Sequence, residues 1–280
     1  MRRCILIDRK EFMEPQQPDY NSPVSIAEGI YWVGFYDAQS GLHCNPYLIV
    51  DGNEAVVIDG GSRPDFPTVM MKILETGISA SSVTALIYQH YDPDLCGSVG
   101  HFEDIIDRTD LKIISHKENN MFIRHYAISS RLISHHAINS EFVFSSGRKL
   151  RFTNTPYAHS PGSFVTFDTR TRVLFTSDLF GSYGAKWDLF LSLKPECHAC
   201  QDLSHCVRGE AYCPVSDILR FHQRIMTSEK ALHHALDIIG EIPALKLAPQ
   251  HGSVLIDPRD IETVSLRLMS LKGVGIDRIR

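Results

Sequence analysis

The chain has 280 residues, of which 43% are hydrophobic, and carries a formal net charge of −5 with a pI near 6.3. This hydrophobic content is enough for a substantial buried core, so we expect a globular protein. The negative charge argues against a nucleic-acid partner, which requires concentrated positive charge. The apolar run in the N-terminal segment MRRCILIDRKEF is too short for a signal peptide, and no segment is long enough to span a bilayer. We therefore expect a cytoplasmic protein with no membrane contact.

The predicted elements follow an extended lead-in at residues 1–23, which is rich in proline and polar residues. Short β-branched and aromatic runs at 29–37, 46–51 and 54–61 predict successive strands joined by hairpin-like turns. Apolar side chains at helical spacing predict a helix over 65–77, and residues 83–89 are typical of a further strand. The chain therefore opens with a sheet and a strand, helix, strand unit.

The later elements repeat this alternation. Strands are predicted at 111–115, 149–156, 163–168, 172–178 and 244–252, and helices near 94–107, 117–128 and 258–271, with one long helical stretch at 215–240. An early sheet and a late sheet with helices between them predict an α+β sandwich with α/β/β/α layers. Because no repeat, low-complexity tract or linker requires a second domain, we predict a single domain over 1–280.

A polar cluster follows the predicted strand at 83–89. In YQHYDPDLCGS (88–98), His90, Asp92 and Asp94 occupy every second position, and would face one point if the extended geometry persisted. Two buried carboxylates are unfavourable together unless they share a proton or a cation holds them, and the imidazole favours the cation. A polar loop built on the Asp-Pro turn at 92–93 is the alternative.

Metal-ligand residue types also follow three later strands. His159 follows the strand at 149–156, Asp178 follows the apolar part of its strand at 172–177, and His251 follows that of its strand at 244–248. Strand-end loops are where rigid scaffolds present functional groups. Each histidine alone would be an ordinary loop residue, but the three imidazoles and three carboxylates together predict a metal site.

The order HxDxD…H…D…H behind the strand VVIDGG resembles the metallo-β-lactamase fold, and within it the diiron domain of flavodiiron proteins. The resemblance covers about residues 24–272. Further matching segments are GIYWVGFYD, NPYLIV, HSPGS, SDLFG and PQHG. The resemblance implies a four-layer metallo-β-lactamase-like sandwich that holds two non-haem iron ions.

The resemblance implies a role for each ligand type. His90, Asp92 and His159 would bind one iron, Asp94 and His251 the other, and Asp178 would bridge both. Zinc hydrolases of this fold resemble HxHxDH, whereas this chain has Asp92 at the second position; the harder oxygen donor favours iron or manganese over zinc. Two divalent ions carry about +4 and three carboxylates about −3, so one bridging hydroxide would leave the cluster near neutral.

Two positions depart from the flavodiiron pattern. Flavodiiron proteins usually have glutamate where Asp92 stands, and the shorter side chain would alter the metal spacing. They also have histidine where this chain has Leu95. The second iron would therefore lack one protein ligand, which leaves an open or water-filled position for a small molecule such as a gas.

Three supporting residues have two interpretations each. Asp59 in VIDGG resembles the buried aspartate that orients the metal loop of this fold, or it caps a turn. Tyr91 and Tyr157 flank predicted ligands, and either donate a hydrogen bond to a bound oxygen species or serve as packing residues.

Four of the cysteines are clustered in the sequence, whereas the other cysteines and the remaining histidines are scattered. Cys197, Cys200, Cys206 and Cys213 form a Cys-rich insertion at 192–214, which is a candidate second metal or redox cluster or a reduced-thiol surface loop. Cys4, Cys44 and Cys96 are scattered, which is typical of core or surface residues. His135–His136 and His233–His234 have no convergent partners in the sequence, so we expect solvated or internally satisfied side chains.

The resemblance implies a diiron protein that binds, and in one version reduces, dioxygen or nitric oxide, so that enzymatic activity is left open. Relatives resemble fusions to a flavodoxin-like module, for which too few residues follow 272; we therefore expect no flavin on this chain and a separate electron-donor or signalling protein. A homodimer is left open. The alternatives are a dinuclear-metal hydrolase acting on a phosphodiester, thioester or lactone, and a metal-bearing interaction module.

Overall fold

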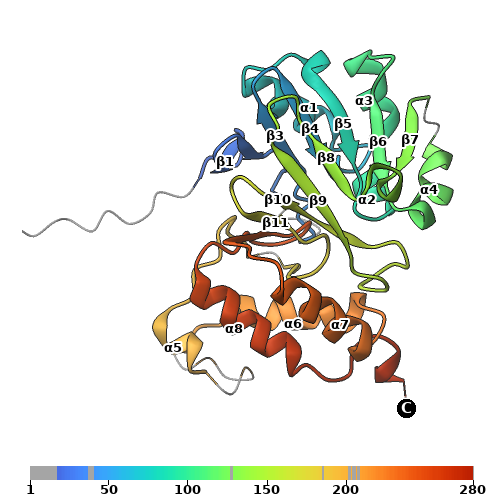
Figure 1. Cartoon of the computed structure of the whole chain (residues 1–280). Helices are drawn as coiled ribbons and strands as arrows, with labels where there is room; N and C mark the ends of the chain where they lie inside the picture. The colour runs from blue at the N-terminus through green and yellow to red at the C-terminus, as the bar shows by residue number, and fades with distance from the viewer. Residues whose placement is uncertain are drawn as a thin grey trace, which may run out of the picture.

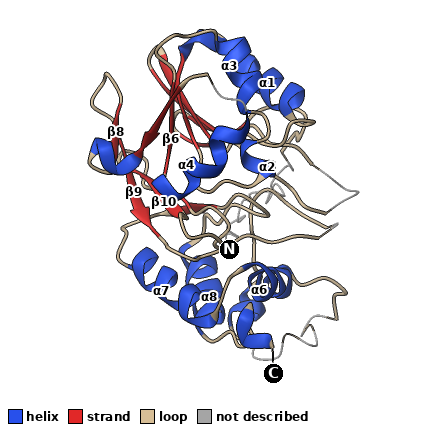
Figure 2. Cartoon of the chain, turned by 90° about the vertical axis from the view of Figure 1, so that its right-hand side faces the viewer, coloured by secondary structure: helices blue, strands red, loops and turns tan. Residues whose placement is uncertain are grey.

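The computed structural model describes residues 18–36, 41–126, 129–184, 186–200, 203, 206 and 209–279. Most of the predicted lead-in at 1–23 lies outside this part of the chain. Two sheets face each other between two layers of helices (Figure 1, Figure 2). This arrangement confirms the predicted α/β/β/α sandwich.

The first sheet consists of strands hydrogen-bonded to one another in chain order: β1 (Val24–Ala27), β2 (Ile30–Trp32), β3 (Tyr47–Asp51), β4 (Glu54–Ile58), β5 (Val83–Ile87), β6 (Lys112–Ser115) and β7 (Arg131–Ser134). The pairs from β1 to β4 are antiparallel, and those from β4 to β7 are parallel. Parallel neighbours require crossover connections. Here the crossovers contain α1 (Phe66–Glu75), the 3₁₀ turn η1 (Ala80–Ser82), α2 (Pro93–Cys96), α3 (Val99–Ile106), α4 (Lys117–Ile123) and η2 (Arg124–Tyr126).

The second sheet has the order β12-β11-β10-β9-β8, formed by β8 (Glu141–Val143), β9 (Lys149–Asn154), β10 (Phe164–Asp168), β11 (Val173–Phe175) and β12 (Lys246–Ala248). The pair β11–β12 is parallel, and the other three pairs are antiparallel. Helices α6 (Pro214–Ile225), α7 (Glu229–Gly240) and α8 (Pro258–Met269) cover its outer face (Figure 2). The short elements η3 (His135–Ile138), α5 (Pro195–His198) and η4 (Ile276–Arg278) complete the described structure.

Both faces of the central strands are buried. In β3, Tyr47 and Ile49 pack in the apolar layer between the sheets, whereas Leu48 packs against the helices outside the first sheet. The same alternation occurs in β4, where Val56 lies between the sheets and Val57 lies outside. Side chains that alternate between two apolar layers explain why these strands are continuous hydrophobic runs.

A buried ion pair connects the two sheets. Nε and Nη2 of Arg148 donate to the two carboxylate oxygens of Asp168 in β10 at 2.9 and 2.8 Å, and both side chains are at most 1% exposed. Nη1 of Arg148 also donates to the carbonyl oxygen of Val50 in β3 at 3.3 Å. One guanidinium therefore binds both sheets, in the bidentate geometry that is specific to arginine.

The structure corrects several predicted elements. The single helix expected at 215–240 is two helices, because Met226 leaves the helical backbone conformation and Ser228 caps α7 by accepting a hydrogen bond from the amide of Ala231. The helix expected at 94–107 is likewise divided into α2 and α3. Strands β7 and β8 were not predicted. None of the described helices is both long enough and apolar enough to cross a membrane.

Candidate metal centre

The six predicted ligand side chains lie together at the end of the sandwich where β5 and β11 exit. The ligand atoms of His90, His159 and Asp178 lie within 4.8 Å of one another, as do those of His90, Asp92 and Asp94. A further group of the same size consists of Asp94, His251 and Cys44. His90 belongs to the first two groups, and Asp94 belongs to the second and third. The three groups therefore form one continuous cluster.

The backbone reaches this cluster by a route that differs from the predicted one. Strand β5 ends at Ile87, and α2 begins at Pro93, so Asp94 lies in the first turn of a helix and not on an extended strand. The alternating-strand argument was therefore wrong for Asp94. Proline at the first helical position explains the turn, because it has the required backbone angle and its missing N–H is not needed there.

One half of the cluster is formed by His90, Asp92 and His159. Nε2 of His159 donates to Oδ2 of Asp92 at 2.8 Å, and Nε2 of His90 lies 3.9 Å from the same oxygen. His159 has a backbone φ of +89°, which is rare for a residue other than glycine. This conformation is compatible with a chain that turns sharply after β9 to bring the imidazole back to Asp92.

The other half is formed by Asp94, His251 and Cys44. Nε2 of His251 lies 3.2 Å from Oδ2 of Asp94, and the thiol of Cys44 is 3.9 Å from that oxygen. Cys44 and His251 are also paired in an isolated β-bridge. The sequence did not single out Cys44, because no ligand spacing connects it to the later residues.

Asp178 lies between the two halves. Its Oδ2 is 3.9 Å from Nε2 of His90 and 3.8 Å from Nε2 of His159, whereas Oδ1 is 3.7 Å from Nε2 of His251. Oδ1 is buried and has no hydrogen-bond partner within the described structure. A buried carboxylate oxygen without a partner costs free energy unless a cation binds it, so the arrangement fits a pair of metal ions bridged by Asp178.

Protons on the imidazoles hold the carboxylates when no metal is bound. Burial alone would lower the pKa of His159, but the hydrogen bond to Asp92 and the charge of Asp178 raise it to about 9. Burial alone would raise the pKa of Asp94, but the hydrogen bond and charge of His251 lower it to about 2. Metal ions would displace these protons, so binding is expected to release them.

The second ring nitrogen of each histidine has its own partner. Nδ1 of His90 is 2.9 Å from the hydroxyl of Ser177, Nδ1 of His159 is 3.3 Å from a carbonyl oxygen of α6, and Nδ1 of His251 is 3.1 Å from the carbonyl oxygen of His43. Such partners orient Nε2 toward a metal. Sequence reasoning missed Ser177, although it directly precedes Asp178.

Asp59 holds the residue before His90. Its two carboxylate oxygens accept hydrogen bonds at 3.0 Å from the backbone amide and from the side-chain amide of Gln89. Burial raises the pKa of Asp59 to about 7, although the Gln89 bonds oppose this shift and the charges of Asp178 and Asp94 add to it. This geometry supports the orienting role that the resemblance implied for Asp59.

Asn45 holds the loop that carries His251. Its amide donates to the carbonyl oxygens of Pro249 at 3.0 Å and Gly252 at 2.8 Å, and the hydroxyl of Tyr47 donates to Pro249 at 2.8 Å. The side chain of Asn45 in turn accepts from the indole of Trp32 at 2.8 Å. The segment NPYLIV therefore positions a ligand from the opposite end of the sequence, which no local pattern indicates.

The two flanking tyrosines and Leu95 lie apart from the ligand groups. The ring of Tyr91 stacks on Phe122 at a centroid distance of 4.3 Å, and Tyr157 is 56% exposed. Leu95 is fully buried in the apolar layer against the first sheet. These positions agree with packing roles for Tyr91 and Leu95, whereas the hydrogen-bonding role of the tyrosines stays a prediction.

The four clustered cysteines line one cavity of about 220 Å³ beside α5 and the start of α6. Cys197, Cys206 and Cys213 have free thiols, and Cys200 is buried. Within the described residues, no three of their sulfur atoms form a group of ligand atoms within 4.8 Å. A metal or redox role for this insertion therefore stays a prediction.

His222 supports the loop that follows Asp178, and this role predicts acid sensitivity. Nε2 accepts from the amide of Phe180 at 2.9 Å, so Nδ1 carries the proton and donates to the carbonyl oxygen of Ile218 at 2.7 Å. Burial lowers the pKa of His222 to about 4, below its unfolded value near 6.5. Its contribution to stability is therefore present above pH 6.5 and is lost as the pH falls toward 4, on the order of 3 kcal/mol.

Urea unfolding of the metal-free protein between pH 7 and pH 4 tests this prediction. In His222→Gln, the amide oxygen still accepts from Phe180 but does not titrate, so the variant should lose less stability on acidification than the wild-type chain. Equal pH slopes for the two proteins would contradict the proposed role of His222.

Comparison with known proteins places this arrangement in a family. The family model described as "ODP family beta lactamase" matches residues 42–252. The type A flavoprotein fprA of Rhodobacter capsulatus is 25% identical over 272 residues, which cover 91% of this chain and 58% of that protein. The anaerobic nitric oxide reductase flavorubredoxin of Aeromonas salmonicida is 24% identical over 256 residues, which cover 84% and 44%. The chain thus spans under three fifths of the length of these relatives.

Solved structures show the same fold. The chemotaxis sensor ODP, in a peroxy diiron state, matches with a TM-score of 0.70 and 22% identity over 92% of this chain and 97% of that one. The rubredoxin:oxygen oxidoreductase of Desulfovibrio gigas matches with a TM-score of 0.73 and 17% identity over 89% and 61%. The metallo-β-lactamase-like fold expected from the resemblance is confirmed.

Proposed function

Because the chain belongs to the ODP family of beta-lactamase-type proteins, we propose that it is a non-haem diiron protein that binds dioxygen. The observation that carries this proposal is Asp178, whose two carboxylate oxygens lie toward the histidines of both halves of the cluster. The relatives with solved structures include a diiron chemotaxis sensor and an oxygen oxidoreductase. The proposed assignment is His90, Asp92 and His159 on one iron, Asp94 and His251 on the other, and Asp178 on both.

The donor set supports iron in preference to zinc. Half of the six side chains are carboxylates, and Asp92 supplies oxygen at a position where zinc hydrolases of this fold have imidazole. Two ferrous ions would supply one electron each to a bound oxygen molecule. The protein's own contribution is to hold both ions, to exclude bulk water, and to hold protons on His159 and His251 before the metal enters.

The gas is proposed to bind on the side of Asp94 and His251. This half has two of the predicted ligands plus the shared Asp178, whereas the other half has three plus Asp178. The thiol of Cys44 borders it, and burial raises the pKa of this thiol, so the metal-free protein holds it protonated. A ligand set with fewer protein donors leaves a position for a small molecule.

The centre is proposed to work with a separate protein, either as an oxygen sensor that signals to it or as a reductase that takes electrons from it. Full reduction of dioxygen to water requires four electrons, and a diferrous pair supplies two. A reductase therefore needs an external donor, whereas a sensor needs a binding partner that distinguishes the oxygen-bound from the oxygen-free form.

Metal analysis and an optical spectrum of anaerobically purified protein, before and after the addition of air, test the proposal. We expect about two irons per chain and a new charge-transfer band in air. Two zinc ions and no spectral change would refute oxygen binding and favour a dinuclear-metal hydrolase. Oxygen uptake with an excess of a chemical reductant then separates the two roles: continuing uptake indicates a reductase, and uptake that stops near one equivalent indicates a sensor.

A further inference from the structure

A second group of histidines lies after the last two parallel strands of the first sheet. Strands β6 and β7 pair in register, with Ser115 opposite Ser134. The next residues in the chain are His116 on one side and the pair His135–His136 on the other. Parallel strands that end in register place the residues after them at the same edge of the sheet, so the three side chains meet although His116 and His135 are 19 positions apart in the sequence.

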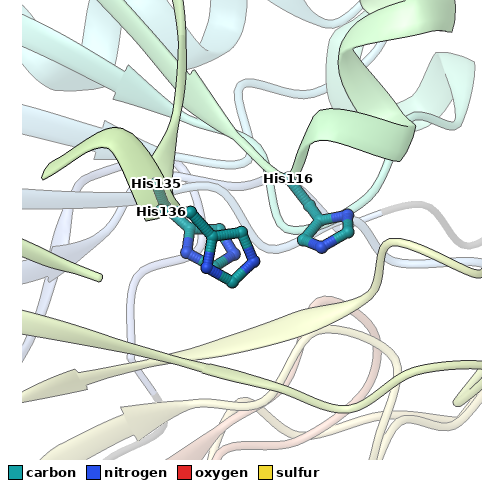
Figure 3. A group of neighbouring side chains, drawn as sticks. All are labelled: His116, His135 and His136. Carbon is teal, nitrogen blue, oxygen red and sulfur yellow. The ribbon is translucent and has the colours of Figure 1, made fainter. Parts of the chain in front are cut away.

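The three rings face a common space (Figure 3). Their centroids are 5.4 Å apart for His116 and His135, 5.2 Å for His116 and His136, and 4.2 Å for His135 and His136. One ring nitrogen from each lies within 4.8 Å of the others. The expectation that His135 and His136 have no convergent partners was therefore wrong, because the partner comes from a strand pairing that the sequence did not reveal.

The ring nitrogens of these three histidines differ in their hydrogen-bond partners. Nδ1 of His116 accepts from the amide of Glu118 at 3.2 Å, so the neutral ring carries its proton on Nε2. A metal ion at Nε2 requires the tautomer with the proton on Nδ1, which gives up the contact with Glu118. Nδ1 of His135 is 3.1 Å from the hydroxyl of Ser140, whereas its Nε2 is fully buried and has no partner within the described structure. An orphaned, fully buried nitrogen beside two further imidazoles is the observation that indicates a ligand.

Asn154 in β9 provides a further polar group at the same place. Its side-chain nitrogen is 3.4 Å from Nε2 of His136, and its side-chain oxygen is buried without a partner. Because the two ends of an amide are interchangeable by a flip, either the oxygen or the nitrogen of Asn154 can face the histidines. Asn154 also interacts with His135, whose pKa this contact raises, so the amide belongs to the same polar group.

Burial favours the neutral form of His135 and His116. Burial, followed by the charges of His136 and His116, lowers the pKa of His135 to about 4. Burial lowers the pKa of His116, and the charges of His136 and Lys117 lower it further. The charge of Glu118 acts in the opposite direction. Neutral imidazoles have a free lone pair at neutral pH, which is the form that binds metal ions.

We propose that His116, His135 and His136 form a binding site for one divalent transition-metal ion of the zinc type, with a fourth position for water or Asn154. Three imidazoles without a carboxylate favour zinc, copper or nickel over iron and manganese, which is the opposite preference to that of the carboxylate-rich centre. A metal ion here would give Nε2 of His135 a partner, whereas contacts between neutral rings give it none.

Zinc binding to a chain whose main centre has been disabled tests the proposal. In the triple variant His90→Asn/Asp178→Asn/His251→Asn, which alters both halves of the main centre, equilibrium dialysis against zinc chloride should show about one tightly bound zinc per chain. Adding His136→Ala, which removes an exposed side chain, should weaken this binding by more than the roughly 10–100-fold that the loss of a supporting contact costs. Adding His125→Ala, another exposed histidine, should leave it unchanged.

A second variant protects the test against a local folding defect. His116 caps α4, and His116→Asn retains a good capping residue while it removes the imidazole, so it should also lose the zinc with an unchanged far-ultraviolet spectrum. In the otherwise unaltered iron-loaded protein, the same two substitutions should remove one zinc without changing the iron content. Zinc bound equally tightly with and without His136 and His116 would overturn the proposal, and the result is independent of whether the main centre holds iron.

Discussion

Asp178→Asn is expected to reduce the metal content from about two ions per chain to at most one. Its two carboxylate oxygens lie toward the histidines of different halves, with Oδ2 near His90 and His159 and Oδ1 near His251. Asparagine removes a negative charge and leaves one oxygen donor, so it can no longer bridge two cations. We expect the affinity for the second ion to fall by at least ~100-fold, since loss of a mere supporting partner costs roughly 10–100-fold.

Calorimetric titration of the metal-free protein with ferrous iron under anaerobic conditions measures this effect. Asp237→Asn, which alters an exposed carboxylate on α7, provides the matched control and should bind as the unaltered chain does. Because the charge of Asp178 helps to keep His159 protonated in the metal-free protein, urea unfolding of the metal-free variant is measured in parallel to establish that it is folded. Two tightly bound ions in Asp178→Asn would show that the carboxylate does not bridge them.

Arg148→Ala is expected to produce the largest loss of stability among single substitutions outside the metal centre. The substitution leaves the carboxylate of Asp168, which is 0% exposed, without its cation. Removal of one partner of a buried ion pair costs about 3–5 kcal/mol, because the remaining charge stays buried. The free energy of unfolding in urea, compared at constant pH, should fall by that amount, a large part of the total stability of a typical domain.

Arg151→Ala tests whether the loss of stability in Arg148→Ala comes from the burial of the ion pair or merely from the loss of a charge. Arg151 also forms an ion pair, with Glu141, but its side chain is 61% exposed, so its removal should cost less than about 1 kcal/mol. The double variant Arg148→Met/Asp168→Leu removes both buried charges and should recover much of the stability lost in Arg148→Ala. Equal losses for Arg148→Ala and Arg151→Ala would show that the contact between the sheets has no special importance.

The residue types of the metal centre could be predicted because each follows a strand and differs from the apolar residues before it. His90, Asp92, His159 and Asp178 are conspicuous in this way, and their order along the chain carries the resemblance. How they are held could not be predicted. Ser177 and Asn45 act through contacts with His90 and the loop before His251, and such contacts depend on packing that the linear pattern does not specify.

Two failures of prediction have different physical causes. Strand β7 is four residues long, and its two ends are exposed or half-buried, so its sequence RLIS lacks a clear alternating pattern. Without β7, His135 had no visible neighbour. The break between α6 and α7 was missed because the apolar spacing continues on both sides of it, although Ser228 is a typical capping residue and was the available signal.

The position of β12 affects how the chain reaches its final state. This strand is three residues long, lies at the edge of the second sheet and pairs in parallel with β11, and it leads into the loop that carries His251. More than half of the chain separates His251 from His90. The pairing of β12 with β11 also joins segments far apart in the sequence, and non-local contacts form slowly, so we expect this pairing among the late steps of folding. A metal ion that binds both His90 and His251 would therefore bind only after β12 has paired. Once bound, it would stabilise the protein against local unfolding of β12.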